Sequence, residues 1–555
     1  MREAPTLYQR RIVIGAGICV IAFALVGIRL VHVSLLKGWD AGRAHAPIVA
    51  RADLTDRNGE LLARDLPVKD LYARPKFFAD PAGAAEGLAA ATGASARRLE
   101  KAFRTAKHAY VLVARQITPD DEAKVMQLGL PGLEFEPSAK RYYPDGRTAA
   151  QVTGVTDLDN NGISGLELGL QPEIHAAAAR GHERGQVATS IDMRVQYILA
   201  HELEQARQTF TAKAAGGIVM DVKTGEILGM VSLPDFDPNQ RGLAPGDSRR
   251  NIMAQDVYEL GSVFKIFSFT MALDDHTLNL NEVFPINRDY KVGRYTIHEA
   301  ERMPATLAAR DVLAQSSNIG TSQIVLRSGA QVQRAFLDHM GLLKPVETDL
   351  PESARPLYPA IKNWGQIETA TIGFGQGISV SPLSFVTAAA EVVNGGRRIT
   401  PTFLRQNGKD RRGEQVISHE TSVKMRDLLR YVVTSGSGKK ADIEGYDVGG
   451  KTGSAQVPGP NGRYLPRALR TSFFAVFPAH QPRYIVYVLM DQPHGTKATA
   501  GFALAGWTAA PAAGRVIERI APLLGVPKQS EPTRLARDTT QQQDGAQPVS
   551  ASESP

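Results

Sequence analysis

The chain has 555 residues, more than the roughly 250 to 300 at which a single hydrophobic core stops growing, so we expect at least two folded units. Apolar residues make up 43% and charged residues 22%, which is ordinary globular usage and excludes a fibrous or wholly disordered chain. Cys19 is the single cysteine, which excludes an intramolecular disulfide and a cysteine-rich zinc site. The net charge of +7 is spread along the chain without a long basic block. This favours an anionic membrane or cell wall, and not nucleic acid, as the surroundings of the protein.

The N-terminus carries an uncharged apolar run, 12–28, whose apolar character resumes after one arginine. The run is long enough to cross a bilayer. A cleaved signal peptide is the competing interpretation, because arginines precede the run, but the small-x-small cleavage motif lies far downstream. We expect a cytoplasmic segment at 1–11, an uncleaved transmembrane signal anchor at 12–36 and a linker at 37–50.

Three regions of different composition follow. From 51 to 190, short alternating runs and Gly-rich turns predict a small β-rich module, with a hairpin turn at Asn58-Gly59. From 191 to 527, clear strands alternate with clear helices, which predicts one large α+β domain with an antiparallel sheet. The last stretch, 528–555, is rich in Gln, Ser, Pro and Asp, so we expect a disordered tail.

The first candidate catalytic pair is Ser262 and Lys265, in the segment YELGSVFKIFSFTMALDD. Gly261 marks a turn and helical periodicity starts just after it, so Ser262 is expected to open a helix. Three residues make about one helical turn, which places both side chains on one face. The amine can then accept the hydroxyl proton, provided that burial lowers its pKa. Taken alone, S-x-x-K is a common chance pattern, and a solvated helix face explains it better.

Two further motifs lie downstream. The triplet Ser-Ser-Asn at 316–318 falls between two helical patterns, where Ser316 and Asn318 can point into a cleft, and helix capping is the structural alternative. The triplet Lys-Thr-Gly at 451–453 lies in a glycine-rich strand, where a close backbone approach and a fixed positive charge are expected. An edge strand with a protective lysine is the alternative there. Neither triplet is convincing by itself.

The combination is far more specific than its parts. S-x-x-K opening a buried helix, S-x-N between helices and K-T-G on a strand, in this order within one α+β domain, form the penicilloyl serine transferase pattern. On these motifs the chain resembles the class B penicillin-binding proteins, most closely their division-specific subgroup, over nearly all of its length except the tail. Three boxes of the N-terminal module, 51–59, 141–144 and 162–167, resemble the family's scaffold and are interpreted as turns and inter-strand ion pairs.

The resemblance implies a fold and catalytic roles. The fold would be α+β: an N-terminal transmembrane helix, a β-rich non-catalytic pedestal of the dimerisation type at 51–190, and a transpeptidase domain at 191–527 whose serine β-lactamase-like antiparallel sheet is flanked by helices. Ser262 resembles the acylated nucleophile and Lys265 the base that activates it. Ser316, with Lys451, resembles the relay that returns a proton to the leaving amine.

The resemblance also implies substrate-binding roles. Asn318 is similar to the residue that holds the donor's amide backbone, and Thr452 with Ser454 would bind the donor's terminal carboxylate. Gly453 would keep the strand open to the donor, and the backbone N–H groups of Ser262 and Ser454 would form an oxyanion hole. Two positions depart from the family's usual residues, because the residue before Gly261 is a leucine instead of a proline and Ser454 replaces a threonine.

The function implied by the resemblance is that of a peptidoglycan D,D-transpeptidase, which cross-links stem peptides at the division septum through a serine acyl-enzyme and releases D-Ala. No cofactor and no metal are implied. The partners would be peptidoglycan stem peptides, β-lactams as covalent inhibitors, the septal polymerase FtsW and other division proteins, and not nucleic acid. The protein would cross the bacterial inner membrane once, with its catalytic domain in the periplasm.

Several alternatives remain open on the sequence. A D,D-carboxypeptidase or an elongation-specific transpeptidase would share the same motifs. A β-lactamase needs a second base, in one class within E-x-x-x-N, whereas Glu391 is followed by Asn394, one position short. A β-lactam sensor would bring a multi-span signalling region. A non-enzymatic division scaffold is disfavoured because all three motifs are intact.

Overall fold

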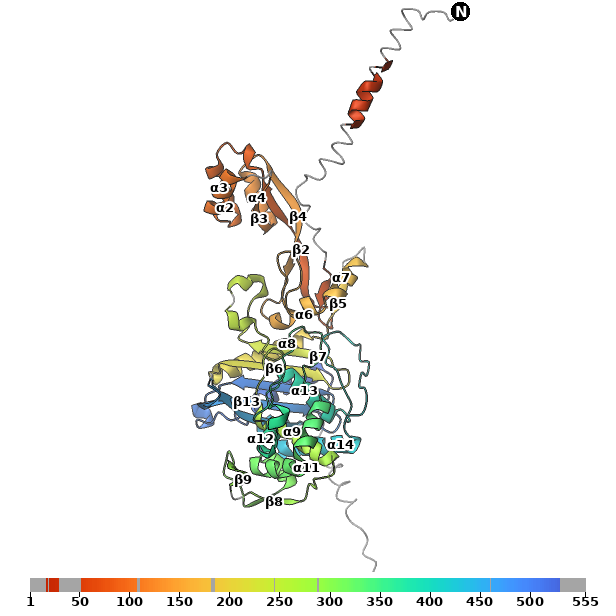
Figure 1. Cartoon of the computed structure of the whole chain (residues 1–555), viewed down its shortest axis with the longest axis vertical. Helices are drawn as coiled ribbons and strands as arrows, with labels where there is room; N and C mark the ends of the chain where they lie inside the picture. Colours follow the sequence, from red (N-terminus) through yellow and green to blue (C-terminus); the bar gives the residue numbers. More distant parts are fainter. Residues whose placement is uncertain are drawn as a thin grey trace, which may run out of the picture. The chain divides into compact units, whose positions relative to one another are not determined.

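The computed structural model describes residues 16–17, 19–28, 51–106, 110–180, 185–243, 245–286, 289–459 and 461–529. The chain divides into two compact units, Met1–Val49 and Ala50–Pro555, and the second holds an N-terminal module and a C-terminal domain (Figure 1).

Most of the predicted terminal segments lie outside the described residues. This holds for 1–11, for 37–50 and for the tail 528–555 apart from its first two residues. Within the predicted anchor 12–36, residues 16–17 and 19–28 are described and are helical. In the part of the chain that the structure describes, no helix combines the length and the hydropathy needed to cross a membrane.

A five-stranded sheet forms the N-terminal module. Its strands are β1 (Asp53–Thr55), β2 (Leu61–Ala73), β3 (Val111–Ile117), β4 (Leu133–Tyr142) and β5 (Gln186–Ala188), and its helices are α2 (Pro81–Thr92), α3 (Ala96–Thr105), α4 (Pro119–Gln127), α5 (Ala150–Thr153), α6 (Gly165–Gly169) and α7 (Gln171–Ala179). The long strand β2 pairs antiparallel with β1, β3 and β4, while β1 pairs parallel with β5. The predicted hairpin is confirmed, because Gly59 turns the chain between β1 and β2 with a φ of +95° that favours glycine.

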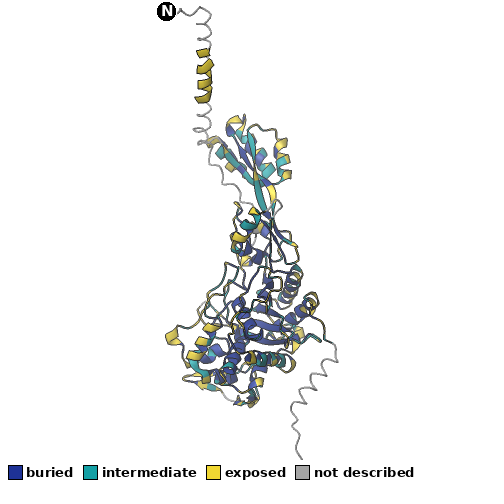
Figure 2. Ribbon diagram, turned by 90° about the vertical axis from the view of Figure 1, so that its right-hand side faces the viewer, coloured by how far each residue is buried: buried dark blue, intermediate teal, exposed yellow. Residues whose placement is uncertain are grey.

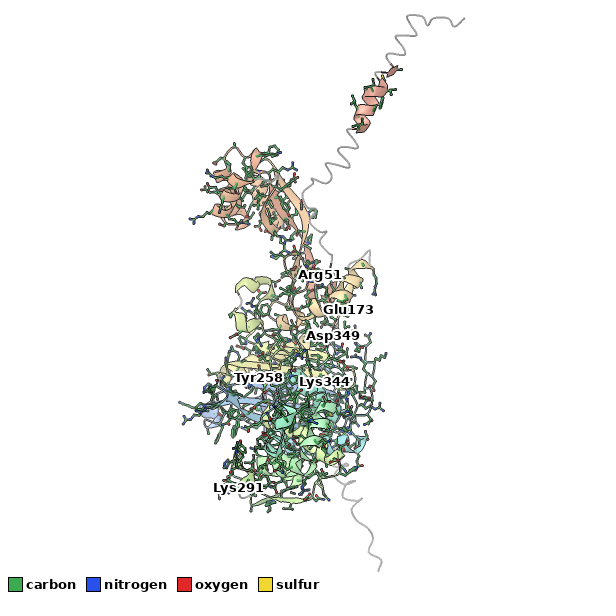
Figure 3. All side chains as sticks on the ribbon, viewed as in Figure 1. Arg51, Glu173, Tyr258, Lys291, Lys344 and Asp349 are labelled. Carbon is green, nitrogen blue, oxygen red and sulfur yellow. The ribbon has the colours of Figure 1, made fainter. Side chains whose placement is uncertain are left out.

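Buried charged side chains join the three scaffold boxes. Arg51 donates to Glu167 Oε2 from Nε at 3.0 Å and from Nη2 at 2.6 Å, and Arg141 Nε donates to Glu167 Oε1 at 2.6 Å. Arg141 Nη1 also donates to Asp65 Oδ1 at 3.1 Å. The predicted inter-strand ion pairs are confirmed by Arg141 on β4 with Asp65 on β2, whereas the pairs to Glu167 join α6 to β4 and to Arg51, labelled in Figure 3, just before β1.

The C-terminal domain is built on a second five-stranded sheet, in the order β12-β13-β14-β6-β7, with all neighbours antiparallel. These strands are β6 (Ala214–Asp221), β7 (Ile227–Leu233), β12 (Gly449–Pro458), β13 (Tyr464–Phe477) and β14 (Tyr484–Asp491). Helices cover both faces: α8 (Met193–Thr209) and α15 (Ala509–Leu523) on one, and α9 (Lys265–Asp274) and α13 (Pro382–Val393) on the other. The predicted antiparallel sheet flanked by helices is confirmed.

The side chains of β13 show why both faces need a helical layer. Phe473 and Phe477 join the core under α8 and α15, whereas Phe474 and Val476 join the core under α9 and α13. Successive residues of a strand point to opposite faces, so an uninterrupted apolar strand has to be covered twice. The strands and the helices around them are buried, as the dark blue ribbon in Figure 2 shows.

Among its described residues, the C-terminal domain has four further short strands and four further α-helices. They are β8 (Val283–Pro285), β9 (Tyr290–Val292), β10 (Tyr295–Ile297), β11 (Thr306–Ala308), α10 (Ala309–Ala314), α11 (Asn318–His339), α12 (Gln366–Gly373) and α14 (His419–Ser435). Helix α9 is buried from Lys265 to Leu273 and packs against α11, α12, α13 and α14. A helix that is covered on every side has to be apolar all round, so the buried lysine at its start stands out.

We expect Glu167→Gln to destabilise the N-terminal module by about 3 to 5 kcal/mol, because it removes the carboxylate shared by two buried guanidinium groups and leaves only Arg141 with another, Asp65. Chemical denaturation of the variant measures the loss. The matched control is Glu134→Gln, which breaks the half-exposed pair with Arg74 and should cost less than about 1 kcal/mol. Equal effects of the two substitutions would contradict a structural role for the buried cluster.

Candidate active site

Ser262 lies on a tight turn that is held against the edge strand of the sheet. The turn is a 3-10 helix, η5 (Gly261–Phe264), and α9 begins one residue later at Lys265, so Ser262 precedes the α-helix that it was expected to open. Gly261 has a φ of +61°, and a side chain there would come within 2.7 Å of the Ser454 carbonyl oxygen. A side chain on Gly453 would come within 2.6 Å of the Leu260 carbonyl oxygen.

The two glycines therefore let the turn and β12 approach each other closely. This gives Gly453 a packing reason that differs from the predicted one, because its missing side chain makes room for the turn. A role of Gly453 in substrate binding stays a prediction. Leu260, which replaces the family's usual proline, has a φ of −92° and is buried, and the turn forms with this residue in place.

Lys265 reaches three motif residues with its side-chain amine. Its Nζ lies 3.0 Å from Ser262 Oγ, 2.5 Å from the Ser316 carbonyl oxygen, 3.2 Å from Ser316 Oγ and 2.9 Å from Asn318 Oδ1. The lysine is fully buried, whereas Ser262, Ser316 and Asn318 are partly accessible. The serine hydroxyl can thus meet a ligand from solvent while the amine behind it stays dry.

The neighbours of this amine are matched to its neutral form. The Ser316 carbonyl and the Asn318 amide oxygen can only accept, so they take the two hydrogens of a neutral amine. Asn318 is oriented accordingly, because its Nδ2 donates to the His298 carbonyl at 3.4 Å. The lone pair of the amine is then left for the hydroxyl hydrogen of Ser262.

The pKa values of the two buried lysines agree with this arrangement. Burial lowers the pKa of Lys265 to about 7, against a smaller opposing effect of the Glu299 carboxylate. The pKa of Lys451 is lowered well below its ordinary value, first by burial and then by the neighbouring Lys265. Near neutral pH, the site therefore holds a lysine that can accept a proton.

Ser316 connects the two lysines. Lys451 Nζ donates to Ser316 Oγ at 2.9 Å and to the Thr452 carbonyl at 2.9 Å, while the same Oγ lies 3.2 Å from Lys265 Nζ. Ser316 has a φ of +65°, a left-handed conformation that costs free energy for a residue with a side chain. In this conformation both its carbonyl oxygen and its hydroxyl reach Lys265, which no local sequence pattern predicts.

Ser317, in the middle of the triplet, caps α11. Its Oγ accepts from the Gly320 N–H at 2.9 Å, so the capping interpretation holds for this serine, while Ser316 and Asn318 face Lys265. The junction between two helices is confirmed, since α10 ends at Ala314 and α11 begins at Asn318.

Glu299 completes the cap and was missed by the sequence analysis. Its carboxylate accepts from Ser317 Oγ at 2.5 Å, from the Asn318 N–H at 2.8 Å and from the Ile319 N–H at 3.0 Å. A carboxylate is stabilising at a helix N-terminus, and here it fixes the position of Asn318. The residue lies in an irregular loop some twenty positions upstream, so the sequence offers no spacing that would single it out.

Thr452 and Ser454 occupy the same face of β12, because they are two residues apart. Thr452 Oγ1 lies 2.6 Å from Ser437 Oγ, and Ser454 Oγ accepts from the Ala505 N–H at 3.1 Å. Strand β12 ends the sheet, so one of its edges has no strand partner among the described residues. The predicted binding of a carboxylate by Thr452 and Ser454, and the predicted oxyanion hole, are not tested by these contacts and stay predictions.

Glu391, the nearest match to a second base, is engaged elsewhere. It lies on α13, where it pairs with Arg398 Nη1 at 3.0 Å and accepts from the Ile399 N–H at 3.2 Å. Burial raises the pKa of this carboxyl to about 7. Its contacts tie α13 to the following segment.

We expect Glu299→Gln to lower the pKa of Lys265 further, because it removes the negative charge that opposes the effect of burial. An NMR titration of isotope-labelled lysine side chains measures this pKa. Glu301→Gln is the matched control, since it removes an exposed carboxylate from the same loop. A pKa that stays unchanged in Glu299→Gln, or that falls equally in the control, would contradict the electrostatic link.

Comparison with protein families and curated sequences extends these observations. Residues 215–511 match the family model described as the penicillin binding protein transpeptidase domain, and residues 48–171 match the penicillin-binding protein dimerisation domain. The chain is 41% identical over 534 residues to the probable peptidoglycan D,D-transpeptidase FtsI of Caulobacter vibrioides (strain NA1000 / CB15N), covering 92% of this chain and 89% of that protein. It is 30% identical over 478 residues to the peptidoglycan D,D-transpeptidase FtsI of Escherichia coli (strain K12), covering 81% of each.

Solved structures agree in fold. Penicillin binding protein 3 of Mycobacterium tuberculosis, complexed with aztreonam or with ampicillin, matches with TM-scores of 0.67 and 0.68 at 24% and 25% identity. The matches cover 87% of this chain and 98% and 97% of the respective structures. The two family models, with the dimerisation domain before the transpeptidase domain, and the extent of the sequence identity confirm the resemblance that the motifs indicated. The chain belongs to the class B penicillin-binding proteins, with a dimerisation domain followed by a transpeptidase domain.

Proposed function

We propose that this protein is a peptidoglycan D,D-transpeptidase that works through an acyl-enzyme on Ser262. The observation that carries the proposal is the buried Lys265 amine, with a pKa of about 7, at 3.0 Å from the partly accessible Ser262 Oγ. A serine becomes a nucleophile when a neighbouring base can take its proton. The names of the FtsI relatives and the match to the transpeptidase domain support the same activity.

The proposed reaction is a ping-pong acyl transfer. Ser262 Oγ attacks the carbonyl carbon of the penultimate D-Ala of one stem peptide, and its proton passes to Lys265. The bond to the terminal D-Ala breaks, and the departing amine takes a proton from Ser316 Oγ, to which Lys451 Nζ donates. Lys265, 3.2 Å from the same Oγ, passes the proton taken from Ser262 on to Ser316 and so restores the relay. The amine of a neighbouring stem peptide then attacks the ester, which forms the cross-link and frees the Ser262 hydroxyl.

The donor peptide would be held by the remaining motif residues. Asn318 would contact its amide backbone and Thr452 with Ser454 its terminal carboxylate, next to the free edge of β12. The backbone N–H groups of Ser262 and Ser454 would stabilise the oxyanion, a device worth about 3 to 4 kcal/mol per donor in serine hydrolases. β-Lactams would acylate Ser262 in the same way, and the aztreonam and ampicillin complexes of a structural relative support this.

The cellular setting is part of the proposal. The apolar run within 12–36 would anchor the protein in the bacterial inner membrane, with the pedestal at 51–190 and the transpeptidase domain at 191–527 in the periplasm. The two relatives named FtsI support a role in septal cross-linking. The septal polymerase FtsW and other division proteins would be its partners there.

Ser262→Ala should abolish covalent labelling of the full chain by a fluorescent penicillin, because the variant lacks the acylated oxygen. Gel fluorescence after denaturation measures the adduct. Ser328→Ala, at a partly buried serine of α11 outside the motifs, is the matched control and should label normally.

The fate of the adduct separates the related activities. A label that persists for hours is expected, since Glu391 is paired with Arg398 and is not free to activate water. Rapid loss of label would instead indicate a β-lactamase. Product analysis with a stem peptide and an acceptor amine then distinguishes cross-linking from hydrolysis by a D,D-carboxypeptidase.

Lys265→Ala should slow acylation by about 10²- to 10⁴-fold, the usual contribution of a general base. In the native protein the acylation rate should rise about tenfold per pH unit below the lysine's pKa of about 7 and level off above it, because the neutral amine is the active form. Stopped-flow measurement with a chromogenic β-lactam gives both quantities. Lys362→Ala, at an exposed lysine, should leave the rate and its pH profile unchanged, and a flat profile in the native protein would refute the assigned base.

A further inference from the structure

A cavity outside the active site, which we call the basic pocket, is lined by residues that take no part in the proposed reaction. It has a volume of about 600 Å³ and lies where the β6–β7 turn, the β13–β14 turn, the end of α13 and the start of α14 meet. Five of its lining side chains are cationic: Lys223, Arg397, Arg412, Arg426 and Arg483. No aspartate or glutamate belongs to the described lining.

Four of the five cations make no salt bridge within the described part of the chain. Arg412 is the exception, because its Nη2 donates to Asp410 Oδ2 at 2.5 Å. Arg397 donates to the Gly413 carbonyl at 2.9 Å, and Arg483 donates to the Gly525 carbonyl and the Tyr484 hydroxyl, both at 3.0 Å. These acceptors are neutral, so they orient the guanidinium groups without balancing their charge.

Arg426 and Lys223 show the excess of positive charge most clearly. Arg426 donates to the His480 carbonyl at 3.0 Å, but its Nε is buried and has no hydrogen-bond partner among the described residues. Lys223 is exposed at the β6–β7 turn. Burial lowers the pKa of Arg426 and the Asp427 carboxylate opposes this only in part, so an acceptor that enters from the pocket would improve the environment of its Nε.

Carboxylates near the pocket balance its cations only in part: Asp410 pairs with Arg412 and acts on Lys223, and Asp427 lies 3.6 Å from His480 Nε2 and acts on Arg426. Asp221 accepts from the backbone N–H groups of Lys223 at 2.8 Å and Thr224 at 3.0 Å, and so closes the β6–β7 turn. Asp447 accepts from His480 Nδ1 at 2.8 Å. Helix α14 begins at His419, which also lines the pocket, and the positive end of the helix dipole adds to the field there.

We propose that the basic pocket binds a diphosphate group. A single carboxylate would balance one of four unpaired cations, whereas a diphosphate brings two or more negative charges and several acceptor oxygens in a compact group. Arginine recognises such oxyanions because its planar fork donates two parallel hydrogen bonds. A cavity of about 600 Å³ leaves room for the group that carries the diphosphate. The proposal does not depend on the proposed transpeptidase activity, because the pocket shares no residue with the active site.

Calorimetric titration of the full chain in detergent with inorganic pyrophosphate tests the proposal, with sodium chloride of equal ionic strength in the reference. Saturable binding with one site per chain is expected. Geranyl diphosphate distinguishes the sources of the group. If it binds with the same affinity as pyrophosphate, the ligand is the bare diphosphate, and if it binds more tightly, the ligand is a lipid-linked diphosphate. Both results support the site. Absence of saturable binding for both probes would overturn the proposal.

Paired variants locate the binding. Lys223→Gln combined with Arg483→Gln should weaken pyrophosphate binding about tenfold or more, whereas Lys344→Gln combined with Lys362→Gln, which removes the same charge from exposed lysines outside the lining, should not change it. Lys344 is labelled in Figure 3. Lys223→Gln alone should show part of the loss, and it keeps the result interpretable if the double variant folds poorly. An equal loss of pyrophosphate affinity in both double variants would mean that net charge alone explains the effect, and it would overturn the site.

An acidic peptide is the competing ligand. A tetra-aspartate peptide that binds more tightly than pyrophosphate, and whose binding is lost in the Lys223→Gln and Arg483→Gln variant, would reassign the pocket to a protein partner. Weaker binding of the peptide supports the diphosphate.

Discussion

Two lysine side chains buried around one serine hydroxyl are the constraint on which the active site depends. Lys265 and Lys451 both reach Ser316 Oγ, and both are removed from water, so they cannot both carry a charge at low cost. Near neutral pH the arrangement therefore contains a proton acceptor beside Ser262. The burial of the Lys265 amine also lowers the stability of the folded protein. Because the folded pKa of Lys265 lies below its unfolded value, the unfolded chain binds more protons between about pH 7 and 10, and the cost grows as the pH falls through that range.

The rest of the domain holds three distant segments at hydrogen-bonding distance. The edge strand β12 brings Lys451, the glycines at 261 and 453 let the Ser262 turn approach that strand, and Glu299 fixes the start of α11. Helix α14 packs against α9, α10 and β12, the elements that carry or precede each motif. The apolar cores on both faces of the sheet supply the stability that offsets a buried, neutralised lysine.

Much of this could be predicted from the sequence, because the signals are local. The β-rich N-terminal module, the antiparallel sheet of the C-terminal domain, the hairpin at Gly59 and the order of the three motifs follow from periodicity and turn residues. The 3-10 turn at Ser262, the left-handed Ser316 and the cap by Glu299 could not be predicted, because each depends on contacts between segments far apart in the chain. The basic pocket is a similar case, since its cations come from separate turns and become neighbours only in the folded domain.

Neutron diffraction from the unliganded protein, at a pH about one unit above the lysine's pKa of about 7, tests the central claim most directly because it locates hydrogens. The account predicts two hydrogens on Lys265 Nζ, directed at the Ser316 carbonyl and Asn318 Oδ1, and a Ser262 hydroxyl hydrogen directed at Nζ. Three hydrogens on Nζ, with one directed at Ser262 Oγ, would mean that the lysine is charged and cannot be the base.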